Sequence, residues 1–148
     1  MISRRLLLAL PAILAARCSS PPPPAVLTLT VIGGADQNPD ASGQDTTVAV
    51  RLFQLKSNAG FERADVFALT EREQQTLGTE GLGSEEFVIK PGENRTITRE
   101  LKPGAQFIGT AVLFRDIDRA RWRGIAPVAA SGPSRRTLTI TRLTAALA

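Results

Sequence analysis

Residues 86–114, EFVIKPGENRTITRELKPGAQFIGTAVLF, decide the fold class of this 148-residue chain. Short runs with strand-forming residues, at 86–90, 94–101 and 106–114, are separated by turn-forming residues, which is the pattern of β-strands. Lys-Pro-Gly occurs at both joints, and a proline followed by glycine fits a type II turn, whose third residue has a positive φ. The stretch therefore predicts three strands joined by tight turns.

The strand at 106–114 differs from the others because it is apolar on both faces. Phe107, Ala111 and Leu113 alternate along it with Ile108, Val112 and Phe114. Successive side chains of a strand point to opposite faces of the sheet. This strand should therefore lie in the centre of a sheet that is covered on both sides.

The same alternation extends the pattern in both directions along the chain. It marks a strand that begins near Leu27 and ends at Gly33, and further strands at 47–55, 124–130 and 136–143. The sequence therefore predicts a mainly β protein, an antiparallel β-sandwich of about seven to eight strands.

A short helical insertion at about residues 61–78 interrupts the strands. The apolar residues at 64, 67 and 68 recur at helical spacing. Thr70 and Glu73 match a capping box, in which both side chains satisfy free backbone amides at a helix start. This pattern predicts two short helices, the second beginning at Thr70.

The composition excludes most catalytic chemistry. The chain has no histidine, no tyrosine and a single cysteine. Ser-His-Asp and Cys-His catalysis and histidine-ligated zinc are therefore excluded, and no internal disulfide can form. No pair of carboxylates converges on a recognisable site, so we expect no catalytic residues, no metal site, no cofactor and no enzymatic activity.

Residues 1–17 have the layout of a signal peptide. Arg4 and Arg5 precede eleven uncharged residues, 6–16, a run too short to span a bilayer, which takes about 20 apolar residues. The whole chain has a formal charge of +4, but removal of this segment takes away three arginines and no acid, so the remainder is close to neutral. We therefore expect an exported protein with no nucleic-acid partner.

Residues 18–24 form a candidate anchor and spacer. Cys18 follows the apolar run directly and precedes two serines and four prolines, an arrangement typical of a lipid-attachment cysteine. The prolines favour an extended polyproline helix of about 3.1 Å per residue. Arg17 stands where a small residue is usual, so cleavage after Ala15 or Ala16, which would give a soluble periplasmic protein, remains an alternative.

Residues 35–46 predict an exposed loop between the first two strands, because they lack apolar periodicity and are rich in turn formers. Oxygen-bearing side chains alternate from Asp36 to Ser42, as at the start of a calcium loop. However, Ala41 and Thr47 stand where an EF-hand has glycine and glutamate, so we expect no metal. A long polar loop in a compact domain is often a contact surface.

Five segments, in order and spacing, resemble the TssJ lipoproteins of bacterial type VI secretion systems. They are VRLFQLKS at 50–57, FERADVF at 61–67, LG at 77–78, PGE at 91–93, and FRDID at 114–118 with Ala120, Trp122 and Arg123. The signal segment followed by Cys18 fits the same family.

The resemblance implies a transthyretin-like β-sandwich, residues 25–148, on the periplasmic face of the outer membrane. Acyl chains on Cys18 would anchor it there as a structural lipoprotein. It would bind the periplasmic C-terminal region of a TssM-like inner-membrane protein and take no small-molecule substrate.

In the resembled family the loop between the first two strands contacts the partner. The corresponding residues here are Asp36, Gln37, Asn38, Pro39, Asp40, Ser42, Gln44 and Asp45. We expect the aspartates to favour a partner with basic groups. The alternative function is a soluble or lipidated periplasmic transthyretin-like ligand carrier or accessory domain, which would need a concave apolar pocket.

Overall fold

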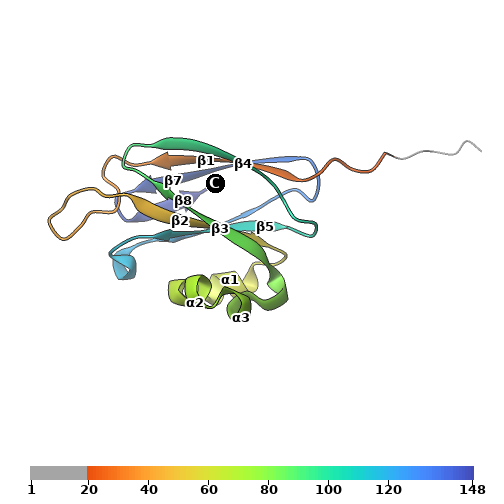
Figure 1. Cartoon of the computed structure of the whole chain (residues 1–148), viewed down its shortest axis with the longest axis horizontal. Helices are drawn as coiled ribbons and strands as arrows, with labels where there is room; N and C mark the ends of the chain where they lie inside the picture. The colour runs from red at the N-terminus through yellow and green to blue at the C-terminus, as the bar shows by residue number, and fades with distance from the viewer. Residues whose placement is uncertain (1–19) are drawn as a thin grey trace, which may run out of the picture.

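The computed structural model describes residues 20–148. Within them, two four-stranded sheets pack face to face, and three short helices cover the outer face of one sheet (Figure 1). The predicted signal peptide, residues 1–17, and Cys18 lie outside the described residues. The mainly β sandwich with a small helical insertion is confirmed.

The first sheet has the strand order β4-β1-β7-β8. Its strands are β1 (Val26–Gly33), β4 (Asn94–Glu100), β7 (Pro133–Thr141) and β8 (Thr144–Leu147). β1 pairs with β4 antiparallel and with β7 parallel, and β7 pairs with β8 antiparallel. The sequence predicts an antiparallel sandwich and does not predict the parallel pair of β1 and β7. This pair forms because most of the chain between the two strands crosses to the opposite sheet and back.

The second sheet has the order β3-β2-β5-β6, with every pair antiparallel. Its strands are β2 (Val48–Leu55), β3 (Gly81–Ile89), β5 (Phe107–Leu113) and β6 (Arg123–Pro127). β5 lies between two neighbours and is buried along its middle, as its two apolar faces predict. The sandwich core covers one face of this strand and the helical layer covers the other.

The main core lies between the sheets and is built from the inward-facing residues of both. Leu27, Leu29 and Val31 of β1 are fully buried there. Burying such a side chain contributes about 1.5–3 kcal/mol. The alternation of these residues with threonines therefore fixes which face of β1 points inward.

A second apolar cluster joins the helices to the outer face of β2 and β5. The rings of Phe53 and Phe61 meet edge to face with their centroids 5.2 Å apart. Phe61 also lies directly over Gly109 of β5, where an added Cβ would come within 2.7 Å of the ring. Glycine at this position allows the helical layer to approach the sheet this closely.

The helical layer differs from its prediction in number and in the position of its cap. It contains α1 (Ala59–Arg63), α2 (Val66–Glu71) and α3 (Glu73–Leu77), followed by a 3₁₀ turn (Gly78–Glu80). The cap is Asp65, whose carboxylate accepts from the amide of Ala68 at 2.8 Å. The capping box at Thr70 is wrong, because this residue lies inside α2 and donates its hydroxyl hydrogen to the carbonyl of Val66.

Both Lys-Pro-Gly joints form the predicted turns. Gly92 and Gly104 have φ of 73° and 90°, and each turn is closed by a bond from the fourth residue to the carbonyl of the first. The predicted strand at 136–143 is β7, which begins earlier, at Pro133, and ends at Thr141, because the chain turns at Arg142, whose φ is 39°, into β8. None of the helices formed by residues 20–148 has the length and apolar content to cross a membrane.

Candidate functional site

The β1–β2 loop, residues 34–47, projects from one end of the sandwich. Residues 20–25 leave from the opposite end, so β1 connects the two ends directly (Figure 1). Eight residues of strand span about 26 Å. The loop therefore lies at the end of the domain that is distal to the candidate anchor.

Gln37 forms the base of this loop and is fully buried. Its side-chain amide donates to the carbonyl of Ile89 at 2.8 Å and to that of Thr46 at 3.2 Å. A buried amide that satisfies two backbone carbonyls is costly to remove. Gln37 therefore holds the loop to β3 and has no side-chain surface to offer to a partner.

Asn38 connects the loop to two other segments at the same end. Its side-chain nitrogen donates to the carbonyl of Thr47 at 3.0 Å, and its Oδ1 accepts from the amide of Arg115 at 2.8 Å. Its own amide donates to the carbonyl of Arg142 at 2.8 Å. The residue is 2% exposed and has a φ of 48°, a left-handed conformation that asparagine tolerates better than most residues.

Asp40 organises the tip of the loop. Its Oδ1 accepts from the hydroxyl of Ser42 at 2.7 Å and from the amides of Ser42 and Gln44 at 2.9 Å each. The Ser42 hydroxyl and then the Gln44 amide are the main causes that lower the pKa of this carboxyl, because they stabilise its charged form. The tip is therefore a closed turn, on which Ser42, Gln44 and Asp45 are exposed.

Charged residues from neighbouring segments border the loop. The amide of Arg142 donates to Oδ1 of Asp36 at 3.1 Å. Arg115 and Asp116 of the β5–β6 connection line a shallow depression with Pro39, Asp40 and Ala41. Sequence reasoning missed Arg115, Asp116 and Arg142 as neighbours of the loop, since no local pattern indicates which loops meet at one end of a sandwich.

The arginine-rich stretch around Trp122 serves packing. Trp122 is half-buried against both apolar clusters. The guanidinium of Arg123 lies 4.5 Å from the Trp122 ring centroid and donates to the carbonyls of Phe61, Glu62 and Ala64. Burial lowers the pKa of Arg123, and the residue secures the end of α1 against the sheet.

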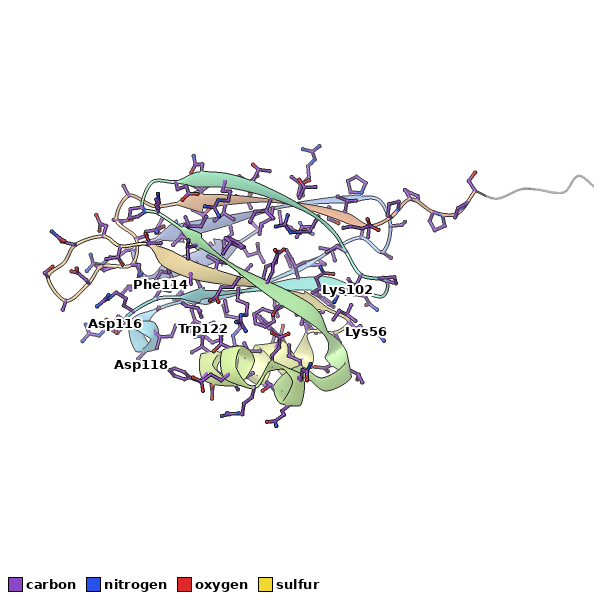
Figure 2. The ribbon with its side chains drawn as sticks, viewed as in Figure 1. Lys56, Lys102, Phe114, Asp116, Asp118 and Trp122 are labelled. Atoms are coloured by element: carbon purple, nitrogen blue, oxygen red, sulfur yellow. The ribbon has the colours of Figure 1, made fainter. Side chains whose placement is uncertain are left out.

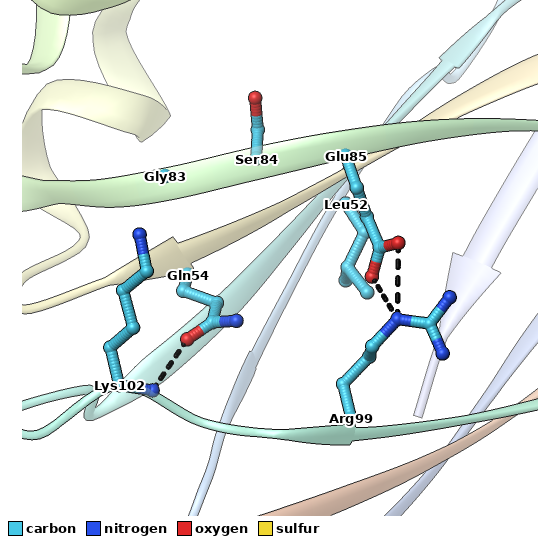
Figure 3. Close-up of a pocket in the computed structure, with 7 residues that line it drawn as sticks. All are labelled: Leu52, Gln54, Gly83, Ser84, Glu85, Arg99 and Lys102. Atoms are coloured by element: carbon cyan, nitrogen blue, oxygen red, sulfur yellow. Dashed lines mark hydrogen bonds and ion pairs between the residues drawn. The ribbon is translucent and has the colours of Figure 1, made fainter.

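A hollow lies between the edges of β3 and β4 and is lined by charged side chains of both sheets (Figure 3). Arg99 and Glu85 form an ion pair across it with an N–O distance of 2.8 Å, and the amide of Lys102 donates to Oε1 of Gln54. Its volume is about 210 Å³, below the roughly 300–1,000 Å³ of small-molecule sites. This small, charged hollow is not the concave apolar pocket that a ligand carrier would need.

No cluster of three or more candidate metal-ligating side chains occurs in residues 20–148.

The predicted loop residues divide into two groups. Gln37 and Asn38 point inward and shape the loop, whereas Pro39, Asp40, Ser42, Gln44 and Asp45 form its tip, with Asp36 exposed at its base.

Comparison with known proteins agrees with this fold. The sequence profile described as "Type VI secretion lipoprotein, VasD, EvfM, TssJ" matches residues 25–143. The T6SS lipoprotein TssJ1 from Pseudomonas aeruginosa is 34% identical, with a TM-score of 0.81 over 85% of this chain and 96% of that one. A search of curated proteins finds no significant match.

Two further solved structures share the fold. Serratia marcescens Lip, described as a membrane-bound component of the type VI secretion system, is 21% identical, with a TM-score of 0.77 over 84% of this chain and 96% of Lip. A chain in a structure described as the TssM C-terminal domain (869–1107) from EAEC is 25% identical, with a TM-score of 0.71 over 84% of this chain and 98% of that one.

The two-sheet sandwich and these similarities define a lipoprotein of the type VI secretion system. The family match takes in most of the chain, and the Pseudomonas structure is similar over nearly the same part. The chain belongs to the TssJ family, which confirms the resemblance noted from its sequence.

Proposed function

We propose that the chain tethers the type VI secretion membrane complex to the outer membrane by binding the periplasmic C-terminal region of a TssM-like inner-membrane protein. In this proposal residues 1–17 are the signal peptide, Cys18 carries the acyl chains, residues 18–24 are the spacer, and residues 25–148 are the binding domain. Two or more acyl chains hold a protein stably at a membrane, whereas one does so only marginally.

The observation that carries the proposal is the placement of the β1–β2 loop at the end opposite residues 20–25 (Figure 1). An anchor at Cys18 would leave this loop as the part that projects toward the inner membrane. β1 joins the two ends and is hydrogen-bonded along its length to β4 and β7. A pull between anchor and partner would run along the backbone of β1, which its pairing with β4 and β7 holds in place.

The loop is also organised before any partner arrives. Asp40 closes the tip through three hydrogen bonds, and Gln37 and Asn38 fix its base. Pro39 further restricts the backbone between them. Binding therefore costs little conformational entropy in this loop, which favours affinity.

The EAEC structure supports the choice of partner. Its description names a TssM segment, 869–1107, that is longer than this chain. The alignment covers 98% of the matched chain but only 84% of the present one. The matched chain is therefore shorter than the present chain, and so shorter than the named TssM segment. The structure described as a TssM C-terminal domain thus holds a chain of this fold, which supports a TssM C-terminal region as the partner.

A binding titration tests the proposal. Residues 20–148 are titrated against the periplasmic C-terminal region of the TssM-like protein encoded in the same genome. Asp45→Lys combined with Gln44→Ala alters the exposed tip and leaves the Asp40 side chain and the backbone amide of Gln44 in place. Glu100→Lys makes a matched charge change on an exposed residue at the other end, opposite Val26.

We expect the tip variant to weaken binding about tenfold or more, the effect of losing a well-placed interface contact, while Glu100→Lys binds as the wild type does. Equal affinities for all three proteins would show that the tip is not the site. Failure of the wild type to bind would contradict the proposal and favour the ligand-carrier alternative.

A further inference from the structure

Phe67 of α2 is the most exposed large apolar side chain of residues 20–148, at 56%. It stands between two shallow hollows of about 280 and 300 Å³, and Val66 and Ile117 line both hollows with it. Leu113 and Phe114 complete the first hollow and Ala120 and Trp122 the second. We call this continuous region, centred on Phe67, the Phe67 surface.

Folding alone does not account for the position of Phe67. α2 packs against the outer face of the sheet through Leu69, which is fully buried in the second apolar cluster, whereas Phe67 belongs to neither cluster. Figure 2 shows Asp116, Asp118 and Trp122 on the side of the sandwich that carries the helices. An exposed apolar side chain that stands among half-buried apolar ones, with polar groups at the rim, is typical of a protein-binding site.

The Phe67 surface is continuous with the surroundings of the β1–β2 loop. Arg115 lines the first hollow and also the depression that contains Pro39, Asp40 and Ala41. The Oδ1 of Asn38 holds the amide of Arg115 at 2.8 Å. One buried side chain therefore fixes the loop and the edge of the Phe67 surface relative to each other.

The rim of this surface specifies the chemistry of its occupant. Asp65, Glu71 and Asp118 place carboxylates around the two hollows. Of the two arginines at the rim, Arg123 is attracted to Asp65 and donates to the backbone carbonyls at the end of α1, which leaves Glu71 and Asp118 against Arg115. An apolar side chain with lysine or arginine beside it is complementary to this combination.

We propose that the Phe67 surface is a second contact for the partner of the β1–β2 loop, and that it receives an apolar side chain flanked by basic residues of the TssM-like periplasmic region. The inference rests on the proposed function for the identity of the partner. The two contacts together make a two-point interface over one end and one side of the domain. Such an interface resists rotation about the loop, which a single projecting loop does not.

The test compares four forms of residues 20–148 in titrations against the TssM-like periplasmic region. They are the wild type, Phe67→Ser, Phe67→Leu and Val88→Ser, the last a matched control because Val88 of β3 is exposed to a similar extent, 51%, and lines neither hollow. Thermal unfolding of each variant verifies that its fold is retained. Sedimentation of the wild type and Phe67→Ser over a range of concentrations reports any self-association.

We expect Phe67→Ser to weaken binding about tenfold, Phe67→Leu to retain most of the affinity, and Val88→Ser to bind as the wild type does. Wild-type affinity in Phe67→Ser, with binding still weakened in the loop-tip variant measured alongside, overturns this inference and leaves the proposed function standing. Absence of wild-type binding overturns both. A change in self-association alone assigns the surface to a second copy of the chain and also overturns the inference.

Discussion

Asn38→Gly is the substitution that most directly tests how the β1–β2 loop is held. Asn38 is buried, so the change leaves every exposed side chain of the loop in place. It removes the donor to the carbonyl of Thr47 and the acceptor of the Arg115 amide. The loop would then lose its side-chain connection to the β5–β6 segment.

The expected magnitude follows from these two bonds. Each contributes about 1 kcal/mol net, and more where its backbone partner remains buried, so the free energy of unfolding should fall by about 2–4 kcal/mol. For a domain of this size that corresponds to a fall in Tm of roughly 8–15 °C. Partner binding should weaken as well, because the tip is no longer held in one orientation.

Asn38→Ala separates the hydrogen bonds from the backbone conformation. Alanine loses the same bonds but also pays about 1–2 kcal/mol for the left-handed φ of 48°. The smaller entropy of its unfolded chain, about 0.4–1 kcal/mol, offsets part of this. Alanine should therefore be less stable than glycine by about 0.5–1 kcal/mol.

Urea unfolding followed by intrinsic fluorescence of Trp122 measures all three proteins. Trp122 lies against both apolar clusters and reports their disruption. A wild-type free energy of unfolding in Asn38→Gly would refute the structural role assigned to the side chain. An alanine variant more stable than the glycine variant would refute the left-handed conformation.

Three further changes test contacts of the helical layer and of the turn at Glu93. Gly109→Ala places a Cβ 2.7 Å from the Phe61 ring and should lower the free energy of unfolding by about 1–3 kcal/mol, whereas an unchanged urea midpoint would contradict this contact. Arg123→Ala removes the donor to three carbonyls at the end of α1 and should speed amide hydrogen exchange there; equal protection would show that the guanidinium does not hold the helix. The pKa of Glu93 is held below its ordinary value, chiefly by the Lys90 amide and also by Arg95. The contribution of Glu93 to stability is therefore present above about pH 4.3 and is lost as the pH falls through the lowered pKa. Glu93→Gln should therefore be less stable than the wild type at pH 7, with a difference that narrows below about pH 4; a difference constant with pH would contradict this.

The sequence predicts those parts of the fold that local chemistry decides. Alternation identifies β1 and β2, and Pro-Gly identifies both turns, because the period of side chains and the sign of φ are local properties. The two apolar faces of β5 correctly indicate a central strand. The parallel pairing of β1 with β7 is not predictable in this way, since it depends on contacts between segments far apart in the chain.

The candidate loop illustrates the same limit. Its position and polarity are evident from the sequence, but Gln37 and Asn38 resemble exposed loop residues although they are buried. Their partners, Ile89 and Arg115, lie far away in sequence, so no local pattern indicates that the amides turn inward. Thr70 was misassigned for a related reason, because Asp65 offers a competing cap earlier in the chain.

The central claim is that one chain connects the outer membrane to a TssM-like protein. The measurement is the amount of the TssM-like periplasmic region that sediments with outer-membrane vesicles. The vesicles bear the full-length wild-type chain, the Cys18→Ser variant, or the combined Gln44→Ala and Asp45→Lys variant. The account predicts sedimentation with the wild type and its loss in both variants, through the anchor in one and the loop in the other. Equal sedimentation with wild type and Cys18→Ser, or with wild type and the loop variant, would contradict it.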